Sequence, residues 1–144
     1  LCFRSIHGTL NHLHLADINW SFRLQGQPVE PSIMAYWRKA DGYSQGDAPL
    51  HWEEYVKDRK ELKLKVCEQA QLLIDIVDQF SNSQLSEPFS LTLGSGAKAT
   101  MPLADVLMHV FNHGTHHRGQ ISAVFPKFGL SPPVLDYFYY CMMT

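Results

Sequence analysis

Apolar residues recur at helical spacing near the start of the chain. Residues 5–25 carry two apolar strips, one with Ile6, Leu10, Leu13, Trp20 and Leu24 and one with Leu15, Ile18 and Phe22. A helix that is apolar on two sides is expected to pack on two sides. Ser5, His12, Asn19 and Arg23 form the remaining polar wedge of this helix.

Two further stretches predict long helices. Along residues 51–80, steps of three and four alternate from Trp52 through Leu62 and Leu73 to Phe80, which is the seam of a helix bundle. Residues 102–126 have an apolar face, and a proline at 102 suits the first turn of a helix. Both stretches are therefore predicted to belong to one bundle.

Glycine and proline break the segments between these helices. Residues 26–50 predict a long connection with one helical turn around 33–40. In residues 81–101, "FSLTL" alternates and "GSG" follows, which predicts a short β-hairpin. After "SPP", the sequence "VLDYFYY" predicts a short helix or an extended aromatic cover.

These elements predict an all-α fold, a helical bundle with a long crossover connection and a short β-hairpin before the last long helix. The 144 residues suffice for one hydrophobic core, so we expect a single domain over 1–144. Bundles favour an even, closed arrangement. Three long helices therefore suggest a four-helix bundle whose first helix would precede Leu1.

Composition excludes several kinds of partner. The net charge of −2 leaves no basic field for a phosphate backbone, so nucleic acid is not expected. No run of eighteen apolar residues predicts a membrane span, and the first residues do not follow the pattern of a signal peptide. Three widely spaced cysteines argue against a disulfide framework and favour a reducing, cytoplasmic setting.

Histidines gather in the last predicted long helix. The stretch "HVFNHGTHHRGQ" holds His109, His113, His116 and His117, which are four of the eight histidines in the chain. Two ligand nitrogens of one zinc ion lie only about 3 Å apart. His109 and His117 are separated by roughly 12 Å along a helix and cannot share an ion.

The direction in which each histidine points from the helix limits which pair could bind a metal ion inside the bundle. His113 belongs to every pair that could bind one ion, with His109, His116 or His117 as its partner. His117 points into the apolar face and His113 lies at its edge, so a metal inside the bundle would take this pair. The alternative to a metal site is a histidine in the core whose ring nitrogens bond to the backbone or to a carboxylate. The third ligand stays open among His7, His12, His14 and His51, and the helical pattern even allows an exposed His12.

Two segments together resemble a known family. "GTLNHLHLADINW" at 8–20 and "MPLADVLMHVFNHGTHHRGQISAVF" at 101–125 resemble the DinB family of damage-inducible, metal-binding four-helix bundles. The order of elements is similar as well, and the resemblance covers nearly the whole chain. It implies a metal site formed by His12, His113 and His117, with nickel or zinc as the divalent transition metal. It also implies a homodimer.

Two further residues match family positions. The resemblance implies that Asp17 orients His12 or an adjacent group from behind the metal ligands. An ion pair of Asp17 with Arg118 or Arg23 is the alternative. Arg118 and Gln120 belong to the matched "HRGQ" sequence. Both are interpreted as structural residues that contact the opposite helix, and support of the ligands is the alternative for Arg118. His109 and His116 are interpreted as flanking residues.

Three functions follow from this resemblance. Relatives in the wider superfamily are thiol-dependent S-transferases, so this chain could join a low-molecular-weight thiol to a small electrophile. The sequence shows no cluster of Lys and Arg for a charged thiol, which counts against this hypothesis. A metal-dependent hydrolase with Asp17 as base is the second hypothesis. A non-catalytic, metal-binding stress-response dimer is the third.

Overall fold

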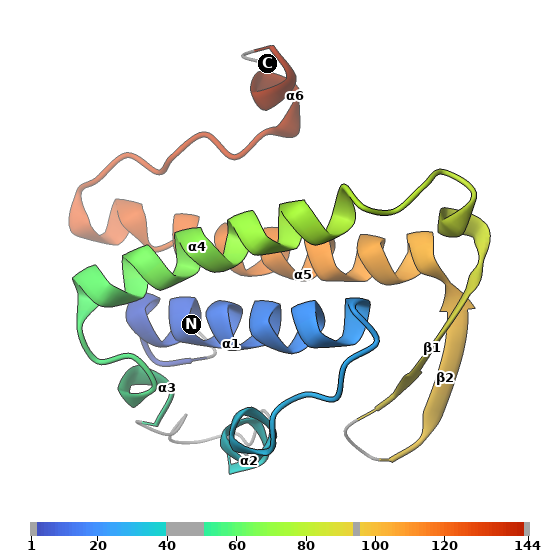
Figure 1. The fold of residues 1–144 in the computed structure, drawn as a ribbon. Coiled ribbons are helices and arrows are strands. Elements are labelled where there is room, and N and C mark those ends of the chain that lie inside the picture. The colour runs from blue at the N-terminus through green and yellow to red at the C-terminus, as the bar shows by residue number, and fades with distance from the viewer. Residues whose placement is uncertain (1–2, 40–50, 94–95, 143–144) are drawn as a thin grey trace.

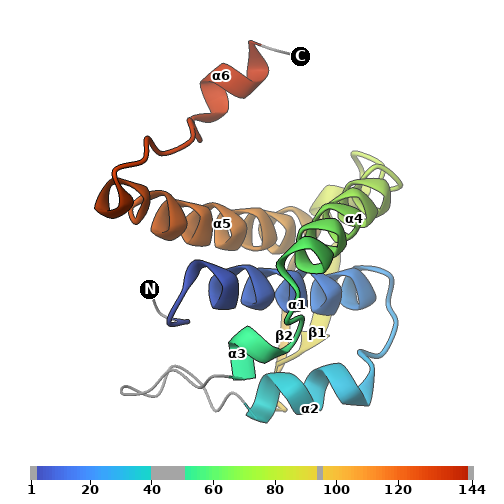
Figure 2. The same cartoon turned by 90° about the vertical axis from the view of Figure 1, so that its left-hand side faces the viewer.

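The fold is built around α1 (Ile6–Leu24). The computed structural model describes residues 3–39, 51–93 and 96–142. On one side, α1 packs against α4 (Arg59–Val77) and α5 (Leu103–Ser122), and α5 runs opposite to the other two (Figure 1). On the other side lie α2 (Pro31–Lys39) and α3 (His51–Glu54), as Figure 2 shows. The predicted all-α fold is confirmed.

The prediction that the first helix packs on two sides is confirmed by two apolar clusters. The first joins α1 to α4, α5 and the hairpin, and its buried members are Leu24, Leu73, Ile76, Leu103, Val106 and Leu107. The second joins α1 to α2 and α3, and its buried members are Phe3, Leu15, Ile33 and Trp52. Both faces of α1 are covered, so its polar wedge also becomes enclosed.

The single helix predicted over 51–80 is wrong, because the structure divides it into α3 and α4. The backbone N–H of Val56 donates to Asn11 Oδ1 at 3.1 Å, and its carbonyl accepts from Asn11 Nδ2 at 3.2 Å. Asp58 then caps α4 by accepting from the N–H groups of Lys60 and Glu61. A tertiary contact and a capping residue together override the seam pattern.

Helix α2 has nine residues and is longer than the single turn predicted there. The hairpin and the C-terminal elements follow the prediction closely. Strands β1 (Pro88–Thr92) and β2 (Lys98–Pro102) form the antiparallel hairpin, and η1 (Gln84–Ser86) precedes it. Helix α5 ends at Ser122, earlier than predicted, and η2 (Phe125–Phe128) follows. In the tail, α6 (Tyr137–Cys141) forms the short helix. No helix in the described ranges has the length and apolar character needed to cross a membrane.

Candidate metal centre

Three histidines from two antiparallel helices meet inside the bundle. His12 lies on α1, and His113 and His117 lie one turn apart on α5. The Nε2 atom of His113 lies 3.2 Å from Nε2 of His12 and 3.2 Å from Nε2 of His117. One ligand atom from each residue lies within 4.8 Å of those of the other two. The structure thus brings together the three residues that the family resemblance implied.

This arrangement fits a metal ion better than it fits hydrogen bonds. Nitrogens bound tetrahedrally to zinc at 2.0–2.1 Å are separated by about 3.3 Å. A neutral imidazole carries one ring proton, so Nε2 of His113 can donate to one of its two neighbours and not to both. Three imidazole nitrogens converging on one point form a donor set that could hold a divalent transition metal ion.

Burial keeps these rings uncharged. Desolvation lowers the pKa of His12 to about 3, and nearby His117 and His113 add to the effect. Burial, followed by the neighbouring histidines, lowers the pKa of His113 to about 4. Burial also lowers the pKa of His117, partly opposed by its hydrogen bond with Gln120. At neutral pH the rings are in the neutral form that binds metals.

Aromatic side chains enclose the His12 ring, which is only 2% exposed. Phe3 stacks on it with ring centroids 3.9 Å apart, and Trp52 and Trp37 lie at 5.0 Å and 5.1 Å. Phe3 reaches this position because the chain folds back at Arg4, which has a left-handed φ of 65°. A Cβ on Gly8 would overlap the carbonyl oxygen of Phe3. Sequence reasoning missed this aromatic wall, since its members lie far apart in the chain.

His117 also contacts a residue on its outer side. Its Nδ1 lies 2.9 Å from Oε1 of Gln120, whose Nε2 lies 2.8 Å from Nε2 of His116. The sequence predicts Gln120 as a structural residue and His116 as a flanking one. The signal that could have identified them is their spacing, because residues three and four apart share a helix face.

Asp17 and Arg118 do not contact the three histidines in the ways considered. Neither ring nitrogen of His12 bonds to Asp17, and no ion pair joins Asp17 to Arg118 or Arg23 in the described residues. Arg118 instead donates to Thr115 on its own helix at 3.0 Å. Burial raises the pKa of Asp17 to about 6, and the charge of Arg118 partly offsets this.

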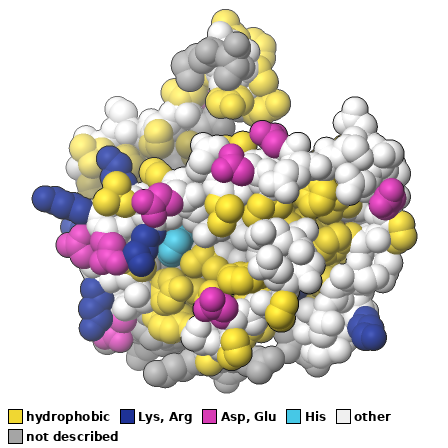
Figure 3. All heavy atoms as spheres, in the orientation of Figure 1, with side chains coloured by type: hydrophobic (Ala, Val, Ile, Leu, Met, Phe, Trp, Pro, Cys, Tyr) yellow, Lys and Arg dark blue, Asp and Glu magenta, His cyan; other side chains and the backbone are white. Residues whose placement is uncertain are grey.

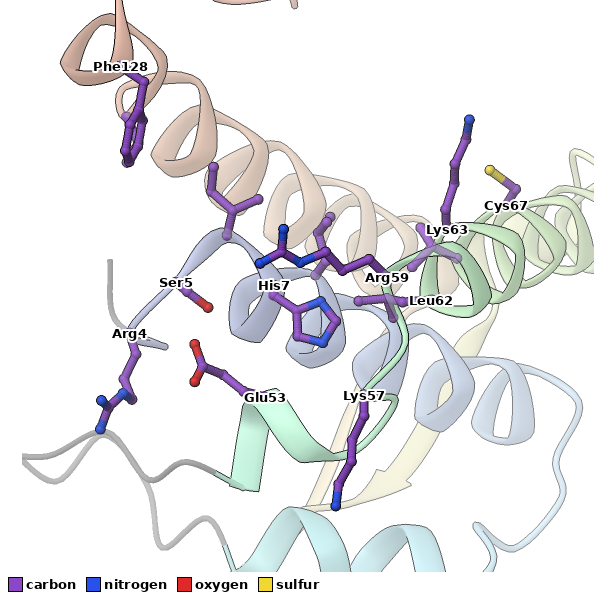
Figure 4. Close-up of a pocket in the computed structure, with 14 residues that line it drawn as sticks. Arg4, Ser5, His7, Glu53, Lys57, Arg59, Leu62, Lys63, Cys67 and Phe128 are labelled. Carbon is purple, nitrogen blue, oxygen red and sulfur yellow. The ribbon is translucent and has the colours of Figure 1, made fainter.

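A cavity of about 930 Å³ lies apart from the histidine cluster, between α1, α3, α4 and the segment after α5 that contains η2. In Figure 4, His7 and Arg59 lie between α1 and α4, and the Glu53 carboxylate points toward Ser5. Nε2 of His7 donates to the carbonyl of Val56 at 2.8 Å. Four cationic residues line the cavity: Arg4, Lys57, Arg59 and Lys63. Lys57, Arg59 and Lys63 lie within one short stretch of the chain, and folding brings Arg4 to them.

Comparisons with known proteins agree with this geometry. The sequence pattern of the DinB family matches residues 2–144. The chain is similar to "Protein DinB" of Bacillus subtilis (strain 168), with 26% identity over 147 residues that cover 99% of this chain and 75% of that protein. No solved structure gave a significant match. Because the family pattern spans almost all of its residues, the chain belongs to the DinB family.

Proposed function

We propose that this protein is a metal-dependent enzyme whose divalent transition metal ion, nickel or zinc, is held by Nε2 of His12, His113 and His117. The convergence of these three atoms carries the proposal. Three histidine ligands leave a coordination position open, which is the pattern of catalytic zinc sites rather than structural ones. When bound, such an ion would lower the pKa of a coordinated thiol or water.

The reaction that we favour is transfer of a low-molecular-weight thiol to a small electrophile. The thiol sulfur would form a bond to an electrophilic carbon, the leaving group would depart with its bonding electrons, and the thiol proton would pass to solvent. The wall of Phe3, Trp37 and Trp52 would exclude water beside the site and offer a surface to an apolar electrophile. The superfamily resemblance supports the same reaction by analogy.

The cavity supplies a group of cationic side chains that bears on an objection to this reaction. A charged thiol needs cationic partners, and the sequence showed no cluster of them. Arg59 and three other cationic residues line one cavity against a single acid, Glu53. The cavity lies apart from the three histidines, and the chain joins the two regions where Phe3, which stacks on His12, precedes the lining residues Arg4 and Ser5. This charge excess favours an anionic thiol over a neutral one.

A metal-dependent hydrolase is the second candidate, and one observation favours it. Burial raises the pKa of Asp17 to about 6, which suits a general base near neutral pH. Asp17 is half-buried and lies on the same helix as His12. In this reaction Asp17 would accept a proton from the attacking water.

Conjugation assays separate these reactions. The zinc- and nickel-loaded protein would be mixed with cysteine or glutathione and monochlorobimane, and a panel of esters would be tested in parallel. S-transfer predicts metal-dependent conjugation that His113→Ala abolishes and that His109→Ala, on the same helix, retains. Ester turnover without conjugation would favour the hydrolase. A metal-loaded protein that is inactive toward every thiol and ester would contradict both reactions.

Metal removal tests the non-catalytic alternative. A structural ion contributes to folding, so a chelator should then lower the melting temperature strongly. A catalytic ion in this bundle should be removable with the fold intact, because two apolar clusters hold α1 without it. Circular dichroism melts with and without chelator measure the difference.

A homodimer is also proposed. Several apolar side chains are well exposed on α4 and α5, among them Leu64 at 63% and Met108 at 71%. Further apolar side chains cover the C-terminal helix, at the top of Figure 3, where Tyr137 is 76% exposed. Exposed apolar surface of this kind commonly marks a protein contact. Light scattering on the purified chain should give twice the monomer mass, and a monomer at micromolar concentration would contradict the dimer.

A further inference from the structure

The three histidines differ in the hydrogen bonds made by Nδ1, the ring nitrogen opposite the converging Nε2 atom. Nδ1 of His117 lies 2.9 Å from Oε1 of Gln120. Nδ1 of His12 is buried without a partner, and the bonds of His113 in the described residues involve Nε2 alone. Gln120 is therefore the residue that orients a ring of this cluster from outside.

The identity of the facing amide atom decides which ring nitrogen of His117 carries the proton. A carboxamide oxygen only accepts, so Oε1 of Gln120 requires a proton on Nδ1 of His117. The lone pair then lies on Nε2, the atom that faces His113 at 3.2 Å. With the amide reversed, its NH₂ group would face Nδ1 and leave the proton on Nε2. That tautomer cannot bind a metal ion through Nε2.

His116 holds the Gln120 amide so that its oxygen faces His117. The Gln120 amide nitrogen donates to Nε2 of His116 at 2.8 Å. Both contacts lie within one turn of α5, because Gln120 is three residues after His117 and four after His116. His117 is 2% exposed, so water has little access to replace the contact.

We infer that Gln120 is a positioning residue, which fixes the Nδ1–H tautomer of His117 and is itself oriented by His116. The inference rests on the proposed metal site. Outer-shell partners of this kind typically change metal affinity by about 10–100-fold when removed. Since His12 and His113 have no such partner among the residues that the structure describes, Gln120 should account for most of that effect here.

The experiment measures zinc affinity by competition with a chromophoric chelator. Gln120→Ala should bind zinc about 10–100-fold more weakly than the wild type. Gln120→Glu keeps an oxygen acceptor for Nδ1–H and should bind at least as tightly as the wild type. Gln71→Ala is the matched control, since Gln71 is an exposed glutamine on α4 that bonds to Asp75. The control should leave the affinity unchanged.

A second readout uses the metal-free protein. Long-range ¹⁵N NMR of the histidine rings should show His117 protonated on Nδ1 in the wild type and in Gln120→Glu, and a tautomer mixture in Gln120→Ala. Unchanged affinity and tautomer in Gln120→Ala would overturn the inference, as would equal losses in the Ala and Glu variants. If the wild type bound no zinc, the proposed function would fail, and the NMR spectra alone would decide the role of Gln120.

Discussion

His14 should make the protein acid-sensitive independently of any metal. This residue lies on α1 and is only 6% exposed. Burial, together with the charge of Lys65, lowers its pKa from 6.5 to about 4, and its Nδ1 has no hydrogen-bond partner. In the unfolded chain His14 takes up a proton near pH 6.5, whereas in the folded chain it does so only near pH 4.

The difference between the two pKa values of His14 determines how the free energy of unfolding changes with pH. Between those two pH values the unfolded state binds more protons, so stability falls as the pH falls. The loss is about 1.4 kcal/mol per pH unit and reaches about 3 kcal/mol by pH 4. Above pH 6.5 the contribution of His14 to stability is fully present.

Urea unfolding of the metal-free protein tests this reasoning. The free energy of unfolding would be measured from neutral pH to about pH 4 for the wild type and for His14→Leu, with chelator present. The difference between the two curves isolates His14, because the other titrating groups are common to both. Leu13→Ala is the control, since this buried neighbour cannot titrate and should lower stability equally at every pH. Parallel curves for wild type and His14→Leu would refute the reasoning.

Three other outcomes are expected. Gly8→Ala forces a Cβ against the Phe3 carbonyl and should lower the free energy of unfolding by about 1–3 kcal/mol. Thermal unfolding measures this, and an unchanged melting temperature would argue against the position of Phe3 beside Gly8. Asn11→Ala leaves the buried N–H of Val56 without its partner and should cost about 1–3 kcal/mol by calorimetry, where a smaller loss would count against that contact. Zinc affinity should begin to fall at a lower pH than the ordinary histidine value of 6.5, because burial lowers the pKa of His12, His113 and His117; a steep loss near pH 6.5 would indicate ordinary, solvated histidines.

Sequence periodicity predicted the helices well where packing follows the apolar pattern. The two strips along 5–25 predicted both the extent of α1 and its burial on two sides. The pattern failed at 55–58, where the seam continues but Asn11 binds the backbone of Val56. Such a contact joins residues 45 positions apart, so no local pattern could reveal it.

The sequence predicted the part of the metal site that lies on one helix, but not the residue that tertiary packing brings to it. His113 and His117 share one helix face, and their pairing followed from phase alone. His12 could not be chosen by periodicity, since it lies in a polar wedge that only the packing of α2 and α3 encloses. The sequence predicts only a structural role for Gln120, because its effect on His117 depends on which amide atom faces that ring.

The metal content of the purified chain tests the central claim most directly. The protein would be expressed without a histidine tag, and inductively coupled plasma mass spectrometry would be applied to the wild type, His113→Ala, His117→Ala and the control His109→Ala. The account predicts close to one nickel or zinc ion per chain in the wild type and control, and none in the other two. A wild type that stays empty after incubation with either metal would contradict it, and so would variants that retain the ion.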